Sequence, residues 1–265
     1  MKIIKKIGII GAGNMGSAIA KGLIRSTNLQ ENSLYISDVN EENLSVLNGF
    51  SKKIKTTTSN IELIENSDVI ILAVKPWLIN SVCQEIKHGI NLHKHIIVSL
   101  AAGVDITTIS NNFEDNIRVF SVIPNTAIEF GESVSIISSY NSKSDVQDLI
   151  VDIFSSLGKA YLVSENQLNA YMSLSSCGIA YALRYIRAAM EGGIEMGIPA
   201  QTAKEVVVQT LKGAISLLEV NNSHPEVEID KVTTPGGITI KGLNEMEANG
   251  FTNSVIKGLK ASHIK

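Results

Sequence analysis

Three glycines near the start of the chain, Gly11, Gly13 and Gly16, form a G-x-G-x-x-G pattern. The pattern follows a β-branched apolar run at residues 3–10 and opens a segment with helical periodicity at residues 14–25. In this context the first glycine permits a tight turn, the second lets a pyrophosphate approach the backbone, and the third lets helix and strand pack closely. The helix start then offers free N–H groups to the phosphates. This predicts a dinucleotide site; the alternative is a tight turn that binds nothing.

A carboxylate is expected to complete this site, because Asp38 ends the second predicted strand. At this place an aspartate can accept hydrogen bonds from both ribose hydroxyls and repel a 2′-phosphate. Residues 39–43 contain no Arg or Lys that could hold such a phosphate. The pattern therefore favours NADH over NADPH. The alternative is that Asp38 only caps the following helix.

Short β-branched runs alternate with helical segments as far as residue 164, which is typical of parallel βαβ units. Several runs are continuously apolar, as expected for central strands covered by helices on both faces. The sequence therefore predicts an α/β fold, an open doubly wound Rossmann-type sheet, in a dinucleotide-binding domain over residues 1–164. The predicted strands are residues 3–10, 34–38, 54–57, 69–74, 96–100, 119–123, 134–137 and 160–163.

From residue 165 to residue 265 the strand pattern ends and long helical segments rich in small residues follow. One predicted helix runs through Leu168, Met172 and Ile186, and another through Val206 and Leu218. Their apolar faces are too extensive for a short bundle to cover, which predicts an all-helical second domain that dimerises. A compact monomeric bundle is the alternative.

Composition narrows the class of protein. Of the 265 residues 44% are hydrophobic and 18% charged, and the net charge is −3. That balance is typical of a globular protein and argues against nucleic acid or an anionic membrane as partner. Cys83 and Cys177 have no partner at metal or redox spacing, so we expect reduced packing thiols and no metal. No stretch approaches membrane-spanning length, and a cytoplasmic protein is expected.

Four further motifs occur in order along the chain. They are Ala73-Val74-Lys75-Pro76, Ser99-Leu100-Ala101-Ala102-Gly103, Ile123-Pro124-Asn125-Thr126, and His224-Pro225 followed by Asp230-Lys231-Val232-Thr233-Thr234-Pro235-Gly236-Gly237-Ile238-Thr239. In these motifs the sequence resembles the pyrroline-5-carboxylate reductase family. The likeness covers essentially the whole chain, and its last motif discriminates better than a glycine loop. It implies NAD(P)H-dependent reduction of 1-pyrroline-5-carboxylate to proline by a homodimer or a larger ring of dimers.

The last motif also has a physical interpretation. Its Pro-Gly-Gly turn exposes backbone N–H groups, and the N-terminus of a helix predicted at residues 238–249 lies beside them. Free N–H groups together with the positive end of a helix dipole suit a bound carboxylate. The hydroxyls of Thr234 and Thr239 flank the turn, and the resemblance implies that Thr239 contacts the ring nitrogen of the substrate. Taken without the resemblance, a plain helix–helix turn is the favoured reading.

The resemblance also implies the remaining site residues. Glu165 occupies the place of a charged residue near the substrate, where it would balance an iminium charge; a solvated acid at a helix start is the alternative. The implied substrate residues are Glu165, Lys231, Thr234, Gly236, Gly237, Ile238 and Thr239, with Thr239 catalytic. The implied cofactor residues are Gly11, Ala12, Gly13, Asn14, Met15, Gly16, Asp38, Asn60, Ala73, Val74, Lys75, Pro76, Ala101, Ala102 and Gly103.

Several positions depart from the family pattern, and three other functions stay open. The usual Ser-Gly-Ser-Gly-Pro-Ala stretch is Ser175-Ser176-Cys177-Gly178-Ile179-Ala180, and Met172, Ser121, Ala127 and Lys231 replace a Thr, an Arg, a Pro and an Asn. A reductase of a related cyclic imine or a non-catalytic NAD-binding sensor would account for these changes. A β-hydroxyacid dehydrogenase would share the architecture, but residues 165–197 lack the lysine that such enzymes use. The His224-Pro225 pair is interpreted as a helix stop rather than a general acid.

Overall fold

The computed structural model describes residues 6–26, 33–113 and 117–263. Packing divides the chain into two compact units, Met1–Ser176 and Cys177–Lys265, called unit 1 and unit 2 below. Unit 1 extends past residue 164 because helix α7 (Leu168–Ser175) packs on its sheet. Leu168 and Met172 are buried there against Ile123 and Ile136.

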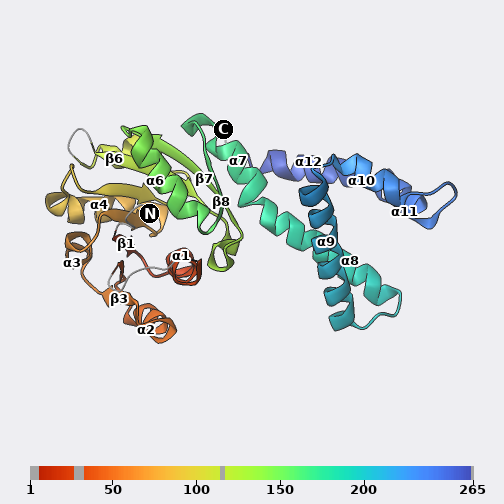
Figure 1. The fold of residues 1–265 in the computed structure, drawn as a ribbon, viewed down its shortest axis with the longest axis horizontal. Coiled ribbons are helices and arrows are strands. Elements are labelled where there is room, and N and C mark those ends of the chain that lie inside the picture. The colour runs from red at the N-terminus through yellow and green to blue at the C-terminus, as the bar shows by residue number, and fades with distance from the viewer. Residues whose placement is uncertain (1–5, 27–32, 114–116, 264–265) are drawn as a thin grey trace. The chain divides into compact units, whose positions relative to one another are not determined.

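All eight predicted strands are present and form one sheet in unit 1 (Figure 1). The order of the strands in this sheet is β3-β2-β1-β4-β5-β6-β7-β8. Each observed strand overlaps its prediction, although several are shorter or longer by a few residues. Residues 3–5 of the first predicted strand lie outside the described residues. The strands are β1 (Ile7–Ile10), β2 (Leu34–Ser37), β3 (Ile54–Thr57), β4 (Val69–Leu72), β5 (Ile96–Ser99), β6 (Arg118–Ile123), β7 (Ser133–Tyr140) and β8 (Gly158–Leu162).

The prediction of parallel units throughout is wrong at one place, because β7 runs antiparallel to β6. Residues 124–132 connect these strands and contain only the short helix η3 (Thr126–Phe130). A parallel crossover needs a dozen or more residues, so this connection can return the chain only in the opposite direction. β8 then pairs with β7 in parallel, and the six strands from β1 to β6 are parallel throughout.

Helices cover both faces of the sheet, as the continuously apolar strands predicted. Residues that alternate along the strands divide into two buried clusters, one containing Ile9 and Ile71, the other Ile10 and Ile70. The first cluster packs against α1 (Asn14–Ser26), α2 (Glu41–Phe50) and α6 (Ser144–Ser155). The second packs against α3 (Asn60–Glu65), α4 (Ile79–Ile86) and α5 (Ile106–Ser110). The remaining short helices are η1 (Pro76–Leu78), η2 (Lys87–Gly89) and η4 (Glu165–Gln167).

Unit 2 is helical in its described residues, as expected. Its helices are α8 (Gly178–Glu195), α9 (Ala200–Asn221), α10 (Pro225–Val232), α11 (Ile238–Ala248) and α12 (Phe251–Ala261). The prediction of one helix through Leu168 and Ile186 is wrong, since α7 ends at Ser175 and α8 begins at Gly178. At this break the Ser176 hydroxyl donates to the Pro124 carbonyl oxygen (2.9 Å). None of the described helices is both long and apolar enough to cross a membrane.

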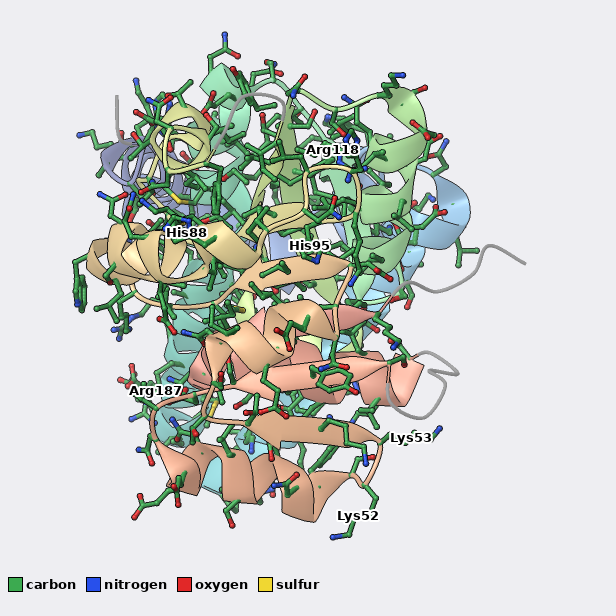
Figure 2. All side chains as sticks on the ribbon, turned by 90° about the vertical axis from the view of Figure 1, so that its left-hand side faces the viewer. Lys52, Lys53, His88, His95, Arg118 and Arg187 are labelled. Carbon is green, nitrogen blue, oxygen red and sulfur yellow. The ribbon has the colours of Figure 1, made fainter. Side chains whose placement is uncertain are left out.

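His95, directly before β5, is a buried polar residue with 2% of its surface exposed. Its Nδ1 accepts a hydrogen bond from the Asn91 N–H (3.0 Å), and Arg118 Nη2 donates to its carbonyl oxygen (3.0 Å). The side chains of His95 and Arg118 are labelled in Figure 2. Burial lowers the pKa of the imidazole below its ordinary value of 6.5, and the Lys94 ammonium lowers it further. In the folded chain this ring therefore binds a proton less readily than a free imidazole does.

We expect the free energy of unfolding to fall as the pH drops below about 6.5, because the unfolded chain then binds a proton that the folded His95 excludes. Urea unfolding from about pH 8 to about pH 5 measures this dependence. The variant His95→Asn keeps an acceptor near the place of Nδ1 but does not titrate, so its stability should depend less on pH in this range. Equal slopes for both proteins would assign the dependence to other groups.

Candidate active site

The glycine loop between β1 and α1 has the geometry that the pattern predicts. Gly11 adopts φ +104°, and its N–H donates to the Ser37 carbonyl oxygen (2.7 Å). A Cβ on Gly16 would lie 1.9 Å from the Gly11 carbonyl oxygen, so this glycine is required for helix–strand packing. A Cβ on Gly13 would meet no heavy atom within 4 Å. The first and third glycines are therefore needed by the fold, whereas the second leaves room beside the backbone.

Asp38 lies at the glycine loop. Its Oδ2 accepts a hydrogen bond from the Ala12 N–H (2.6 Å), and its Oδ1 accepts one from the Asn40 N–H (2.8 Å). The alternative that Asp38 only caps the next helix is wrong, because Asn40 is the N-cap of α2 and accepts from the Glu42 N–H. The carboxylate thus connects the ends of the first two strands.

Two further loops that carry predicted cofactor residues follow β4 and β5. The Ala73 N–H donates to the Ile10 carbonyl oxygen (2.8 Å), and the Leu100 N–H donates to the Leu72 carbonyl oxygen (3.0 Å). In the second of these loops the Ser99 hydroxyl accepts from the Ala101 N–H (3.2 Å). Because β2, β1, β4 and β5 are parallel neighbours, these loops lie at one edge of the sheet with the glycine loop and Asp38.

Asn60 is joined to the same edge by a side-chain network. The Ser37 hydroxyl donates to Asn60 Oδ1 (2.6 Å), and Asn60 Nδ2 donates to Glu85 Oε2 (2.9 Å). Ser37, Glu85 and Ser99 were not among the predicted cofactor residues. A small hydroxyl residue at the end of a buried strand is a usable signal for two of them, but the distance of Glu85 along the chain gives none.

Glu165 has a definite partner within unit 1. Its Oε1 accepts a hydrogen bond from the Ile106 N–H (2.9 Å), at the first residue of α5. The N-cap residue of that helix, Asp105, makes no side-chain capping bond. Glu165 is therefore more than a solvated acid at a helix start, since its carboxylate holds the N-terminus of a different helix.

In unit 2 the predicted carboxylate turn lies between α10 and α11. Gly236 adopts φ +73°, and the Gly237 N–H donates to the Thr234 carbonyl oxygen (2.9 Å). Gly237 is the N-cap of α11 and supplies no side-chain acceptor, so no cap side chain occupies the helix N-terminus. Ile238 and Thr239 are exposed in its first turn. The turn thus has the form that suits an anionic group, although it also connects two helices.

Lys231, in the last turn of α10, is paired with an acid that sequence reasoning missed. Its ammonium lies 2.8 Å from Glu228 Oε1, which also accepts from Ser223 and Asn221. The hydrogen bond from Lys231, followed by that from Ser223, lowers the pKa of Glu228 to about 2. The i, i+3 spacing of Glu228 and Lys231 is visible in the sequence and could have predicted this ion pair.

The interpretation of His224-Pro225 as a helix stop is wrong. His224 is the N-cap of α10, where its Nδ1 accepts from the Glu226 N–H (3.3 Å), and Pro225 occupies the first helical position. A proline suits that position because its fixed φ matches a helix and its missing N–H would have had no intrahelical partner. The preceding helix, α9, ends at Asn221, and its C-cap residue Asn222 adopts a left-handed conformation.

Comparison with known proteins matches each of two parts of the chain to a described family. The family described as pyrroline-5-carboxylate reductase dimerisation matches residues 165–265, and the family described as NADP oxidoreductase coenzyme F420-dependent matches residues 6–103. Pyrroline-5-carboxylate reductase from Methanosarcina acetivorans is 34% identical over 97% of each chain. The chain belongs to the pyrroline-5-carboxylate reductase family.

Other members of the pyrroline-5-carboxylate reductase family differ in length and in what is bound. Pyrroline-5-carboxylate reductase 1 from Dictyostelium discoideum is 37% identical over 98% of this chain, which spans 49% of that relative's length. The crystal structure of pyrroline carboxylate reductase from Plasmodium falciparum with NADP bound superposes with a TM-score of 0.87 at 28% identity, covering 97% of this chain and 95% of that one. Membership argues against the β-hydroxyacid dehydrogenase alternative.

Two departures from the pattern of the pyrroline-5-carboxylate reductase family have clear places in unit 1. Ser121 is buried in β6, where it is paired in register with Ser138 of β7. Ser176 holds the end of α7 to Pro124, in the Pro-Asn-Thr motif. The hydroxyl of Ser176 is therefore integrated into the fold of unit 1.

Proposed function

We propose that this chain reduces 1-pyrroline-5-carboxylate to L-proline with NADH or NADPH. The observation that carries the proposal has two parts. The glycine loop, Asp38 and the loops after β4 and β5 lie together at one edge of the sheet in unit 1, which we call the cofactor edge, and the Pro-Gly-Gly turn leads into a helix N-terminus without a capping side chain. The chain is similar over most of its length to reductases named for this substrate. NAD(P)H supplies the hydride when bound, so the protein needs chiefly to bind and orient the reactants.

The residues of the chain have separate tasks in this proposal. The backbone beside Gly13 takes the pyrophosphate, because the space next to it is open, and the loops at Lys75 and Ala102 flank the rest of the cofactor. The N–H groups at the start of α11, with Lys231 nearby in sequence, hold the substrate carboxylate. The Thr239 hydroxyl contacts the ring nitrogen as that atom changes from a planar imine to an amine.

The assay is oxidation of NADH or NADPH by the purified chain with 1-pyrroline-5-carboxylate, with proline identified as product. Cofactor binding can be followed independently, because Trp77 is the only tryptophan and lies on η1 directly after Lys75 and Pro76. Energy transfer from Trp77 to the dihydronicotinamide reports binding, and Trp77→Phe removes the signal. Cofactor binding without turnover would support the non-catalytic sensor instead.

A preference for NADH over NADPH is expected from Asp38. Its carboxylate lies at the glycine loop, and Val39, which is 92% exposed, offers no cation for a 2′-phosphate. The double variant Asp38→Ser with Val39→Arg should narrow or reverse the ratio of kcat/KM for the two cofactors. A clear NADPH preference in the unmodified chain would show that Asp38 serves the loop rather than the ribose.

The dimer proposal is supported by how little unit 2 buries. Among its described residues, 177–263, only Gly193 and Ala203 are buried. Many large apolar side chains are exposed instead, and a folded surface of this kind normally lies in an interface. They include Tyr181, Leu183, Tyr185, Ile194, Met196, Val206, Ile215, Leu217, Val220, Val232, Ile238, Phe251, Val255 and Ile256.

We expect Ile215→Glu to dissociate the dimer and remove activity, because Ile215 is 56% exposed on α9 and a carboxylate there opposes apolar association. Light scattering should give twice the chain mass for the unmodified protein, or a multiple of that for a ring of dimers. Lys212→Glu, on the same helix, is the control for added negative charge. A fully active monomer would exclude the dimer.

A further inference from the structure

The loop that follows β5 is held at both of its ends by side chains. At its start the Ser99 hydroxyl accepts from the Ala101 N–H (3.2 Å), and beyond its end Glu165 Oε1 accepts from the Ile106 N–H (2.9 Å). Between these points Gly103 adopts φ +78° and Asp105 makes no capping bond. In the proposed function this loop, residues 101–103, contacts the cofactor.

The two elements that the Glu165–Ile106 bond joins are both packed into the core of unit 1. Glu165 begins η4, directly before α7, and Leu168 is buried against Ile123 and Ile136 in the sheet. At the other end of the bond, α5 is anchored by Ile106, which is 1% exposed, and by the fully buried Ile109. A hydrogen bond between two anchored elements fixes the backbone more effectively than one to a mobile surface segment.

We infer that Glu165 is a positioning residue for the cofactor loop after β5, not a counter-ion for the substrate. The inference rests on the proposed function, because it is the cofactor that the loop is held against. The consequence is that the acceptor atom of Glu165 matters more than its charge.

Three variants distinguish a role of Glu165 as a hydrogen-bond acceptor from a role of its negative charge. Glu165→Gln keeps an oxygen that can accept from Ile106 and removes the charge, whereas Glu165→Ala removes both. Asp105→Ala removes a negative charge at the same helix start without removing a capping bond. NADH affinity is measured by energy transfer from Trp77, with kcat, KM for each substrate and the melting temperature of every variant.

The expected result is that Glu165→Ala weakens NADH binding about two- to tenfold, the range for loss of one hydrogen bond, while the other two variants bind like the unmodified chain. Equal weakening in Glu165→Gln and Glu165→Ala, or a loss in kcat alone shared by both, would overturn the inference in favour of a charge role. Unchanged NADH affinity in Glu165→Ala would also overturn the inference, because the bond to Ile106 would then have no effect on cofactor binding. If the unmodified chain neither binds NADH nor turns over, it is the proposed function that fails.

Discussion

Replacing Gly13 with glutamate is expected to abolish cofactor binding and leave the chain folded. The Cβ of the new residue meets no heavy atom of the protein within 4 Å, so the glycine loop can keep its conformation. In the proposed site the same space belongs to the pyrophosphate, where the added side chain collides and its carboxylate repels the phosphates. The variant should therefore lose both NADH binding and NADPH binding.

The matched control is Gly16→Ala, three residues further along the same loop. Its Cβ would lie 1.9 Å from the Gly11 carbonyl oxygen, so this smaller substitution should cost about 1–3 kcal/mol of stability through overpacking. Trp77 energy transfer measures cofactor binding, and thermal unfolding measures stability. Near-normal NADH affinity in Gly13→Glu would remove the assignment of the glycine loop as the pyrophosphate site.

Removing the Thr239 hydroxyl is expected to lower kcat/KM for 1-pyrroline-5-carboxylate about ten- to a hundredfold in Thr239→Ala. Thr239 is exposed in the first turn of α11, two residues after Gly237. Its hydroxyl is thus next to the N–H groups proposed to hold the carboxylate, within reach of the adjacent ring nitrogen. NADH affinity should be unchanged, because the cofactor edge belongs to unit 1.

Thr239→Ser is the control, since it keeps the hydroxyl and loses only a methyl group, and it should retain most activity. A purely structural role predicts a different pattern. Thr239→Ala would then lower the melting temperature and leave kcat/KM almost unchanged. Both quantities measured on the same preparations decide which role the hydroxyl has.

The sheet was predictable from the sequence because each strand has a local signal. Runs such as residues 69–74 are continuously apolar, and all eight runs are strands. The direction of β7 was not read from its own residues, because an apolar run looks the same in either direction. Only the length of the connection at residues 124–132 contained that information.

The cofactor edge could be predicted residue by residue where a motif marks it, but its supports could not. Ala12 and Asp38 stand out in the glycine pattern and at a strand end, and the structure joins them by a hydrogen bond. The bond from Ile106 to Glu165 spans 59 residues and depends on where α7 packs, which no local pattern specifies. Glu85, a partner of Asn60, could not be predicted either, because the two residues are 25 positions apart and no local pattern connects them.

In the proposed dimer, the scarcity of buried side chains in unit 2 makes stability depend on the concentration of the chain. An isolated copy buries only Gly193 and Ala203 among residues 177–263, which leaves little apolar burial to offset the conformational entropy lost on folding. Association would supply more apolar burial, so by mass action each chain would act as a stabilising ligand for the other. Dilution alone should then favour unfolding of unit 2, at a temperature where a concentrated solution remains native.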